Sequence, residues 1–150
     1  MKYTIKLTLL TLLIVNAQAG AKKTVSPISK TVEMIYYDDG SIKESVLLKN
    51  GIKEGRSYSN YPDGSKKAEI YYVNGKVHGI SKGWYNNGNL RGVEVVENGV
   101  RQGYRRSYYK SGKKRDVVLY KDGDPVEINM YHEDGSILYK RNYREDVSTD

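Results

Sequence analysis

Glycine returns in this chain at a fixed interval of 24 residues. Three sets of glycines keep this interval, and one set of tyrosines keeps it with them: Gly40, Gly64, Gly88 and Gly112; Gly51, Gly75, Gly99 and Gly123; Gly55, Gly79 and Gly103; and Tyr37, Tyr61, Tyr85 and Tyr109. Gly135 follows one residue early, which a single deletion in the last unit explains. A period of about 20 to 50 residues predicts a repeat architecture, in which each unit buries its surface against its neighbours.

Two kinds of turn alternate along the chain, one at the glycines of the first set and one at the glycines of the second set. Asn or Asp directly precedes each glycine of the second set, and such a pair supplies the two positive φ angles of a type I′ hairpin turn. The segments between turns suit strands of about six to eight residues, for example residues 66–73 and 76–85. A turn signal every 11 to 13 residues leaves no room for a useful helix. The sequence therefore predicts an all-β fold, an elongated single-layer antiparallel β-meander of about five 24-residue hairpin repeats.

The third glycine of each unit lies inside a predicted strand, where glycine costs about 0.5–1 kcal/mol relative to alanine. Alternation along the strand places Gly79 on the same face as Ser81 and Gly83. Small side chains line this face, and we expect an aromatic ring from an adjacent strand to lie flat over the bare backbone of Gly79. On this interpretation Gly79→Val destabilises the array by overpacking.

The opposite face of the same strands mixes aromatic and basic residues. In two successive units it carries Ile80, Lys82 and Trp84, and then Tyr104, Arg106 and Tyr108. Trp, Tyr and Arg are the residue types most enriched among the hot spots of protein interfaces. The sequence therefore predicts a partner-binding surface, anchored by Trp84, Tyr104, Arg105, Arg106 and Tyr108.

The first 19 residues have the pattern of a cleavable secretory signal. Lys2 and Lys6 give a positive start, residues 7–15 are apolar, and Ala-Gln-Ala at residues 17–19 is a small-x-small cleavage site. The apolar run is too short for a membrane anchor, since a spanning helix needs about 20 residues. The predicted product is periplasmic or secreted, which argues against nucleic acid as a partner. Loss of the two lysines lowers the net charge from +7 to +5.

After the signal, the sequence divides into a linker at residues 20–30, the repeat array at residues 31–146 and a frayed tail at residues 147–150. In the last unit Glu127 replaces the third glycine, His132 replaces the repeated tyrosine, and Pro125 follows the hairpin turn. A terminal repeat is expected to be atypical because it caps an open edge. Pro125 and the charged residues 140–146 are expected to discourage edge-to-edge pairing.

No residue pattern points to catalysis, and the sequence predicts neither a cofactor nor a metal site. Cysteine is absent, which excludes disulfides and thiolate chemistry. His78 has Glu54 and Gln102 as counterparts in the neighbouring units, so we interpret it as a solvated strand residue without a repeated role. Aspartates gather at the turns, but Asp is favoured there for backbone reasons, and their spacing fits no calcium loop.

The unit Y-x-x-G-x-(I/L/K)-(K/R), followed by an N-G turn and the third glycine, resembles the MORN repeat in its bacterial variant form over residues 31–144. That form includes the YwqK-like antitoxins. The resemblance implies an elongated, twisted, single-layer sheet of successive hairpins. It also implies a non-enzymatic role as a protein-binding or membrane-associated scaffold and, for the YwqK-like members, neutralisation of a toxin.

Two functions of different classes stay open at this point. The first is an exported, non-catalytic protein that binds a protein partner, as an immunity or antitoxin factor that neutralises a toxin. The second is a structural envelope protein whose basic face associates with anionic lipid or glycan. The densest basic cluster suits both functions, and it also suits a solvated face that keeps an open sheet soluble: Arg101, Arg105, Arg106, Lys110, Lys113, Lys114 and Arg115.

Overall fold

The computed structural model describes residues 4–9 and 28–143, and every regular element within them is a β-strand. The strands are β1 (Thr4–Leu9), β2 (Lys30–Tyr36), β3 (Ile42–Lys49), β4 (Ile52–Asn60), β5 (Lys66–Val73), β6 (Lys76–Val77), β7 (Gly79–Trp84), β8 (Leu90–Glu97), β9 (Val100–Tyr108), β10 (Lys114–Lys121), β11 (Asp124–Tyr131) and β12 (Ile137–Asn142). Most of the predicted signal peptide and linker, and the whole predicted tail, lie outside the described residues. Signal cleavage therefore stays a prediction.

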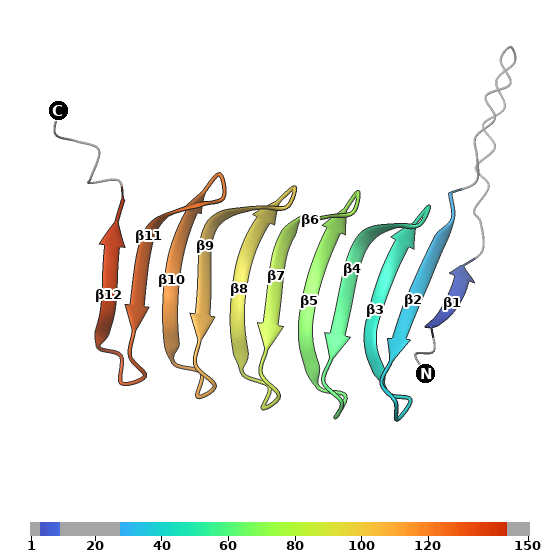
Figure 1. The fold of residues 1–150 in the computed structure, drawn as a ribbon, viewed down its shortest axis with the longest axis horizontal. Helices are drawn as coiled ribbons and strands as arrows, with labels where there is room; N and C mark the ends of the chain where they lie inside the picture. Colours follow the sequence, from blue (N-terminus) through green and yellow to red (C-terminus); the bar gives the residue numbers. More distant parts are fainter. Residues whose placement is uncertain (1–3, 10–27, 144–150) are drawn as a thin grey trace, which may run out of the picture.

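The described strands form one antiparallel sheet in which neighbours along the chain are neighbours in space. The order is β1-β2-β3-β4-β5-β7-β8-β9-β10-β11-β12, with the short β6 paired to β5. Figure 1 shows the strands side by side, with β1 and β12 at opposite ends of the sheet. The structure thus confirms the predicted open, single-sheet meander. Its regularity follows from the short turns, which join only antiparallel neighbours.

The hairpin corners have the backbone that their sequence predicts. Asn50, Asn74, Asn98 and Asp122 have φ of 52°, 49°, 53° and 53°, and each is followed by a glycine whose φ lies between 79° and 93°. Two successive positive φ angles define a type I′ turn, which joins the twisted strands of a hairpin without splaying them. The prediction from the Asn-Gly and Asp-Gly pairs is confirmed.

The repeated tyrosines link each unit to the next. The hydroxyl groups of Tyr37, Tyr61, Tyr85 and Tyr109 each donate a hydrogen bond of 2.8 Å to a backbone carbonyl, those of Asn60, Trp84, Tyr108 and Tyr131 respectively. The acceptor is always the residue just before the next repeat position, which is Tyr61, Tyr85, Tyr109 or His132. The 24-residue spacing of tyrosine therefore reflects a ladder of hydrogen bonds across the sheet, along the edge that carries the turns of Gly40, Gly64, Gly88 and Gly112.

The third glycine of each unit lies in a β-bulge that has two extra residues. Val46 pairs with Ser57 and Leu48 with Lys53, so one residue of β3 faces three residues of β4, with Gly55 among them. The same two-residue excess surrounds Gly79 and Gly103. These glycines have φ of 87°, 83° and 66°. Positive φ is the left-handed region that glycine enters without penalty, so the bulge is the reason for its recurrence.

The predicted aromatic cover over Gly79 is absent. A β-carbon built on Gly79 would have no heavy atom within 4 Å, and the same holds for Gly103. The prediction that a ring packs on this backbone was wrong. Its premise, that glycine in a strand must make room for a neighbour, overlooked the alternative that the backbone itself needs a positive φ.

The single deletion in the last unit falls in the same bulge. Leu119 pairs with Glu127 and Tyr120 with Pro125, so the strand β11 has one extra residue where the earlier units have two. The extra residue is Val126, and Glu127, at the position of the third glycine, is paired with Leu119. Neither is among the described residues with positive φ. This bulge thus has one extra residue instead of two and no longer needs a glycine, so Gly135 comes one position early while the strands on either side stay paired.

The two faces of the sheet differ in burial. Residues paired across antiparallel strands point to the same face. One row across the sheet consists of Ile35, Glu44, Ser59, Ala68, Gly83, Gly92, Ser107, Asp116, Met130 and Tyr139, and defines the buried face. The row one residue along consists of Met34, Ser45, Tyr58, Glu69, Lys82, Val93, Arg106, Val117, Asn129 and Lys140, and defines the exposed face.

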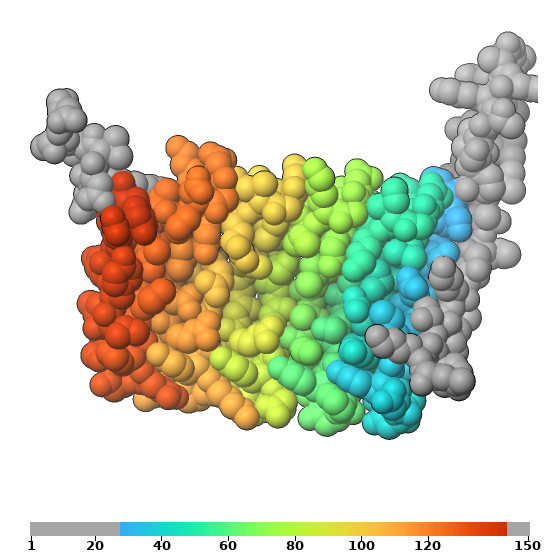
Figure 2. Space-filling view, viewed as in Figure 1, coloured from blue at the N-terminus to red at the C-terminus, as the bar shows by residue number. Residues whose placement is uncertain are grey.

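The most buried of the described residues all lie on the buried face: Val46, Ser57, Val96, Ser107, Asp116 and Val118. None of the described side chains falls below 2% exposure, as expected of a sheet without a second layer. Figure 2 shows one side of the molecule, where no coloured element covers the strands. Stability must therefore come from the strand ladder and from contacts between neighbouring side chains, because no closed core exists among these strands.

Candidate binding surfaces

The exposed face carries the aromatic and basic residues predicted to bind a partner. Lys82 pairs with Val93, and Val93 pairs with Arg106, so the two basic residues lie in one row. Tyr104, two residues before Arg106 on β9, is 43% exposed. The Arg106 guanidinium lies 5.2 Å from the centre of its ring, so the two side chains are presented together. Other large side chains are exposed on this face, among them Tyr58, Tyr71 and Ile80.

Four of the five predicted anchors belong to this face by strand alternation: Trp84, Tyr104, Arg106 and Tyr108. The fifth, Arg105, lies on the other face. It pairs with Val118, and its Nη1 lies 3.3 Å from Asp116 Oδ1. The structure therefore separates Arg105 from the other anchors, because consecutive strand residues point in opposite directions.

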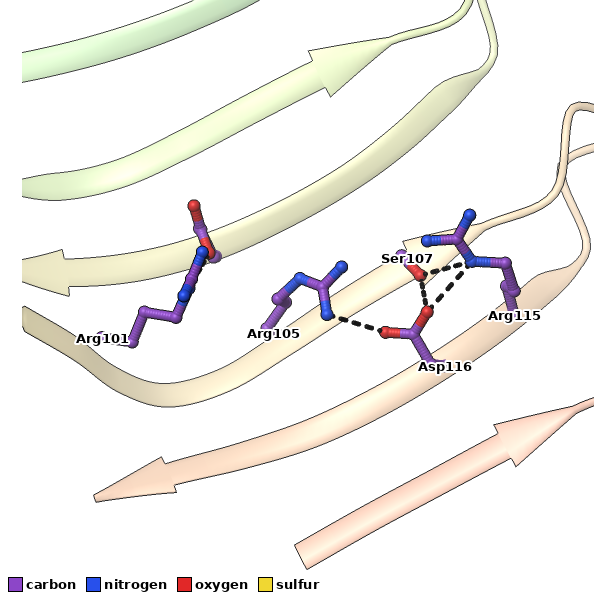
Figure 3. Close-up of polar contacts among 6 residues, drawn as sticks. Arg101, Arg105, Ser107, Arg115 and Asp116 are labelled. Carbon is purple, nitrogen blue, oxygen red and sulfur yellow. Dashed lines mark hydrogen bonds and ion pairs between the residues drawn. The ribbon is translucent and has the colours of Figure 1, made fainter. Parts of the chain in front are cut away.

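Asp116 gathers two arginines on the buried face. Its Oδ2 lies 3.1 Å from Arg115 Nε, and it also accepts a short hydrogen bond from the Ser107 hydroxyl. Arg115 Nε donates to Ser107 Oγ as well, at 3.2 Å. Figure 3 shows Arg105 and Arg115 reaching this carboxylate from its two sides, with Arg101 apart from them. One buried carboxylate thus holds two guanidinium groups, which leaves the cluster with excess positive charge.

A hollow of about 360 Å³ opens beside this cluster, over strands β5 to β10. We call it the arginine hollow. Four small residues of one row form its floor: Ala68, Gly83, Gly92 and Ser107. Three arginines border it: Arg91, Arg105 and Arg115. A β-carbon built on Gly83 would lie 3.1 Å from Arg91 Nη2. The predicted line of small residues is present, and an arginine, rather than an aromatic ring, covers part of it.

His78 has a role that recurs in three consecutive units. Its Nδ1 accepts a hydrogen bond of 3.3 Å from the backbone N–H of Asn98, the first residue of the next hairpin turn. In the neighbouring units Glu54 accepts from Asn74 N at 2.8 Å, and Gln102 accepts from Asp122 N at 3.1 Å. The interpretation of His78 as a residue without a repeated role was therefore wrong. The 24-residue spacing of three acceptor side chains was the signal for it.

The turn aspartates bind their own backbone. Asp39, Asp63 and Asp134 each accept from the hydroxyl and the backbone N–H of the serine two residues later, at 2.5–2.6 Å and 2.8–2.9 Å. These bonds, the hydroxyl first, hold the pKa of each carboxyl below its ordinary value. Within residues 4–9 and 28–143 no group of three or more His, Asp or Glu side chains could hold a metal ion. The aspartates thus have the backbone role that turn chemistry predicts.

These lowered pKa values predict a pH effect. A carboxyl whose pKa is depressed by folding adds stability that is present above its unfolded pKa of about 4 and is lost as pH falls through the folded value. We expect urea unfolding midpoints to drop between about pH 5 and about pH 2, the range in which carboxyl groups take up protons. A triple variant with Ser41, Ser65 and Ser136 changed to alanine should lose less of its stability over this range. An equal drop in both proteins would contradict the assignment.

The comparison with protein families agrees with this geometry. A model described as the MORN repeat variant matches residues 53–74, 77–98 and 101–122. The chain is a MORN-variant repeat protein. The match covers less of the chain than the resemblance over residues 31–144, and the hairpins on both sides of the matched residues belong to the same sheet. No curated protein and no solved structure matches the chain.

One further observation concerns membranes. In the part of the MORN-variant chain that the structure describes, no helix has the length and apolar character needed to cross a bilayer.

Proposed function

We propose that this MORN-variant protein is an exported, non-catalytic binding protein that holds an acidic protein partner on its exposed face, as an immunity or antitoxin factor. The observation that carries the proposal is the register that puts Lys82 and Arg106 in one row, beside the exposed ring of Tyr104. The only carboxylate of that row, Glu69, is 3.8 Å from Arg56. The row therefore offers uncompensated positive charge among aromatic side chains, the combination that favours an acidic partner with apolar anchors.

The architecture supports a binding role because it offers a broad surface rather than an enclosed pocket. Solenoid-like arrays use such extended surfaces for docking. The exposed tyrosines supply contact area at a small entropic cost, since each has only two side-chain torsions. No pair of described side chains on this face has the arrangement of a nucleophile and its base, which favours binding over catalysis.

The test is capture of a partner from the envelope fraction of the native cell, with matched variants as bait. We expect the wild-type protein to capture an acidic protein, and the double variant Tyr104→Ser/Arg106→Ser to lose it. The control is Tyr139→Ser/Arg101→Ser, which removes the same kinds of side chain from the buried face, where Arg101 pairs with Val96. Tyr139 is 41% exposed but lies in the row of the buried face. The captured protein must then bind again in purified form and be toxic when produced without this protein.

Two results would overturn the proposal. Equal capture by both double variants would place the contact elsewhere. Sedimentation with phosphatidylglycerol vesicles that falls steeply with salt, without a protein partner, would favour the structural envelope role instead.

A further inference from the structure

Two consecutive units place an arginine at the same repeat position. Arg91 and Arg115 stand 24 residues apart, and each is the residue that the strand pairing skips. Arg115 Nε bonds Ser107 Oγ, and Arg91 lies over Gly83, which is the counterpart of Ser107. The two guanidinium groups therefore occupy equivalent places on the buried face.

The two units differ in what meets that guanidinium. Asp116 follows Arg115 and binds it, whereas Gly92 follows Arg91 and provides no carboxylate. Within the described residues Arg91 forms no ion pair. The next carboxylate along its strand, Glu94, is held by Arg101 at 2.8 Å. Asp116 thus shows which group an arginine at this position binds, and the unit of Arg91 lacks it.

We propose that the arginine hollow binds a carboxylate of a partner protein, an Asp or Glu side chain on an extended acidic segment, in the place equivalent to that of Asp116. Arg91 is the principal ligand, and its planar fork suits a carboxylate in two-point contact. The proposal rests on the proposed function only in that the partner is an acidic protein. It concerns the opposite face of the sheet and can fail separately.

Two features of the hollow support this occupant. Three arginines border the hollow, while its nearby carboxylates are already held: Glu94 by Arg101, and Asp116 by Arg105 and Arg115 together. An incoming anion therefore meets net positive charge. Ser81 Oγ, on a residue that lines the hollow, is buried and has no hydrogen-bond partner within the described part of the chain. Because the floor is made of Gly, Ala and Ser, a side chain can approach the strands closely.

The test uses a fluorescein-labelled hexaglutamate peptide and fluorescence anisotropy with the purified protein. We expect saturable binding that Arg91→Ala weakens about tenfold, the loss of one charge-assisted contact. Arg91→Lys should weaken binding several-fold although it keeps the charge, because an ammonium lacks the planar fork. Lys67→Ala is the matched control. It removes a cation from the same repeat position, but Lys67 Nζ lies 5.6 Å from the ring of Tyr61, so binding should change less than about twofold.

A second variant, Gly92→Asp, supplies the missing carboxylate from within and should abolish peptide binding. A β-carbon built on Gly92 would lie 3.2 Å from the carbonyl oxygen of Arg106, so circular dichroism must show that Gly92→Asp is folded. If Gly92→Asp is unfolded, the result for Arg91→Ala decides the test. If Arg91→Ala and Lys67→Ala lose hexaglutamate affinity equally, the peptide responds only to the net charge of the protein, and the proposal is overturned. Binding of phosphatidylglycerol vesicles without hexaglutamate binding would overturn it too. A partner captured through the exposed face would leave the proposed function intact in either case.

Discussion

Gly79→Val is expected to lower the free energy of unfolding by about 1–3 kcal/mol, the cost of forcing a β-branched residue into the left-handed region. Gly79 has φ of 83°, and a β-carbon there would meet no heavy atom within 4 Å. The loss therefore comes from backbone strain and not from crowding. Urea denaturation monitored by circular dichroism measures it.

Gly79→Asn separates strain from crowding. Asn enters the left-handed region far more readily than Val, so the asparagine variant should lose much less stability. Gly55→Val provides the opposite comparison, because Leu47 Cδ2 lies 3.0 Å from a β-carbon at Gly55 and crowding adds to the strain there. We expect Gly79→Asn to be the most stable of the three variants, Gly79→Val to come next, and Gly55→Val to be the least stable. Similar losses for Gly79→Asn and Gly79→Val would show that the bulge backbone is not the reason for this glycine.

The sequence predicted the fold of this chain in some detail because its turns are local. Whether Asn74 and Gly75 form a type I′ turn depends on two residues, and strands between such turns can only pair with their neighbours. The order of the sheet followed from that. The repeated tyrosines were also recognised, although their hydroxyl ladder depends on where the carbonyl of the next unit lies.

The features that sequence reasoning missed depend on register. Whether Gly79 faces a ring or bends the backbone depends on how many residues of β7 face β5, and alternation alone does not give that number. The meeting of Arg105 with Asp116 links residues 11 apart across a turn. Because the pairing of β10 with β9 skips Arg115, Asp116 pairs with Ser107 and lies on the face that Arg105 also occupies. Nor did composition indicate which face is buried, since Val occurs on both.

Asp116→Ala is expected to destabilise the protein by about 1–3 kcal/mol. The Asp116 side chain is 8% exposed, whereas Arg105 and Arg115 are 32% and 43% exposed. Removing the carboxylate leaves two guanidinium groups and the Ser107 hydroxyl without their shared acceptor, but water can reach the arginines, which keeps the loss below that of a fully buried pair. Urea denaturation measures the loss.

A double variant tests whether this loss belongs to the ion pair. Asp116→Ala/Arg115→Ala should cost less than the sum of the two single changes, because each single change already removes the contact. Additive costs would contradict the assignment.

Peptide binding by Asp116→Ala is a separate test. If the cluster is only structural, this variant should bind hexaglutamate as the wild-type protein does. If Arg91 binds a carboxylate as Arg115 binds Asp116, however, Asp116→Ala also frees a second arginine on the same face. The variant should then bind hexaglutamate more tightly than the wild-type protein while being less stable, and a weaker or equal affinity would separate the two arginines in function.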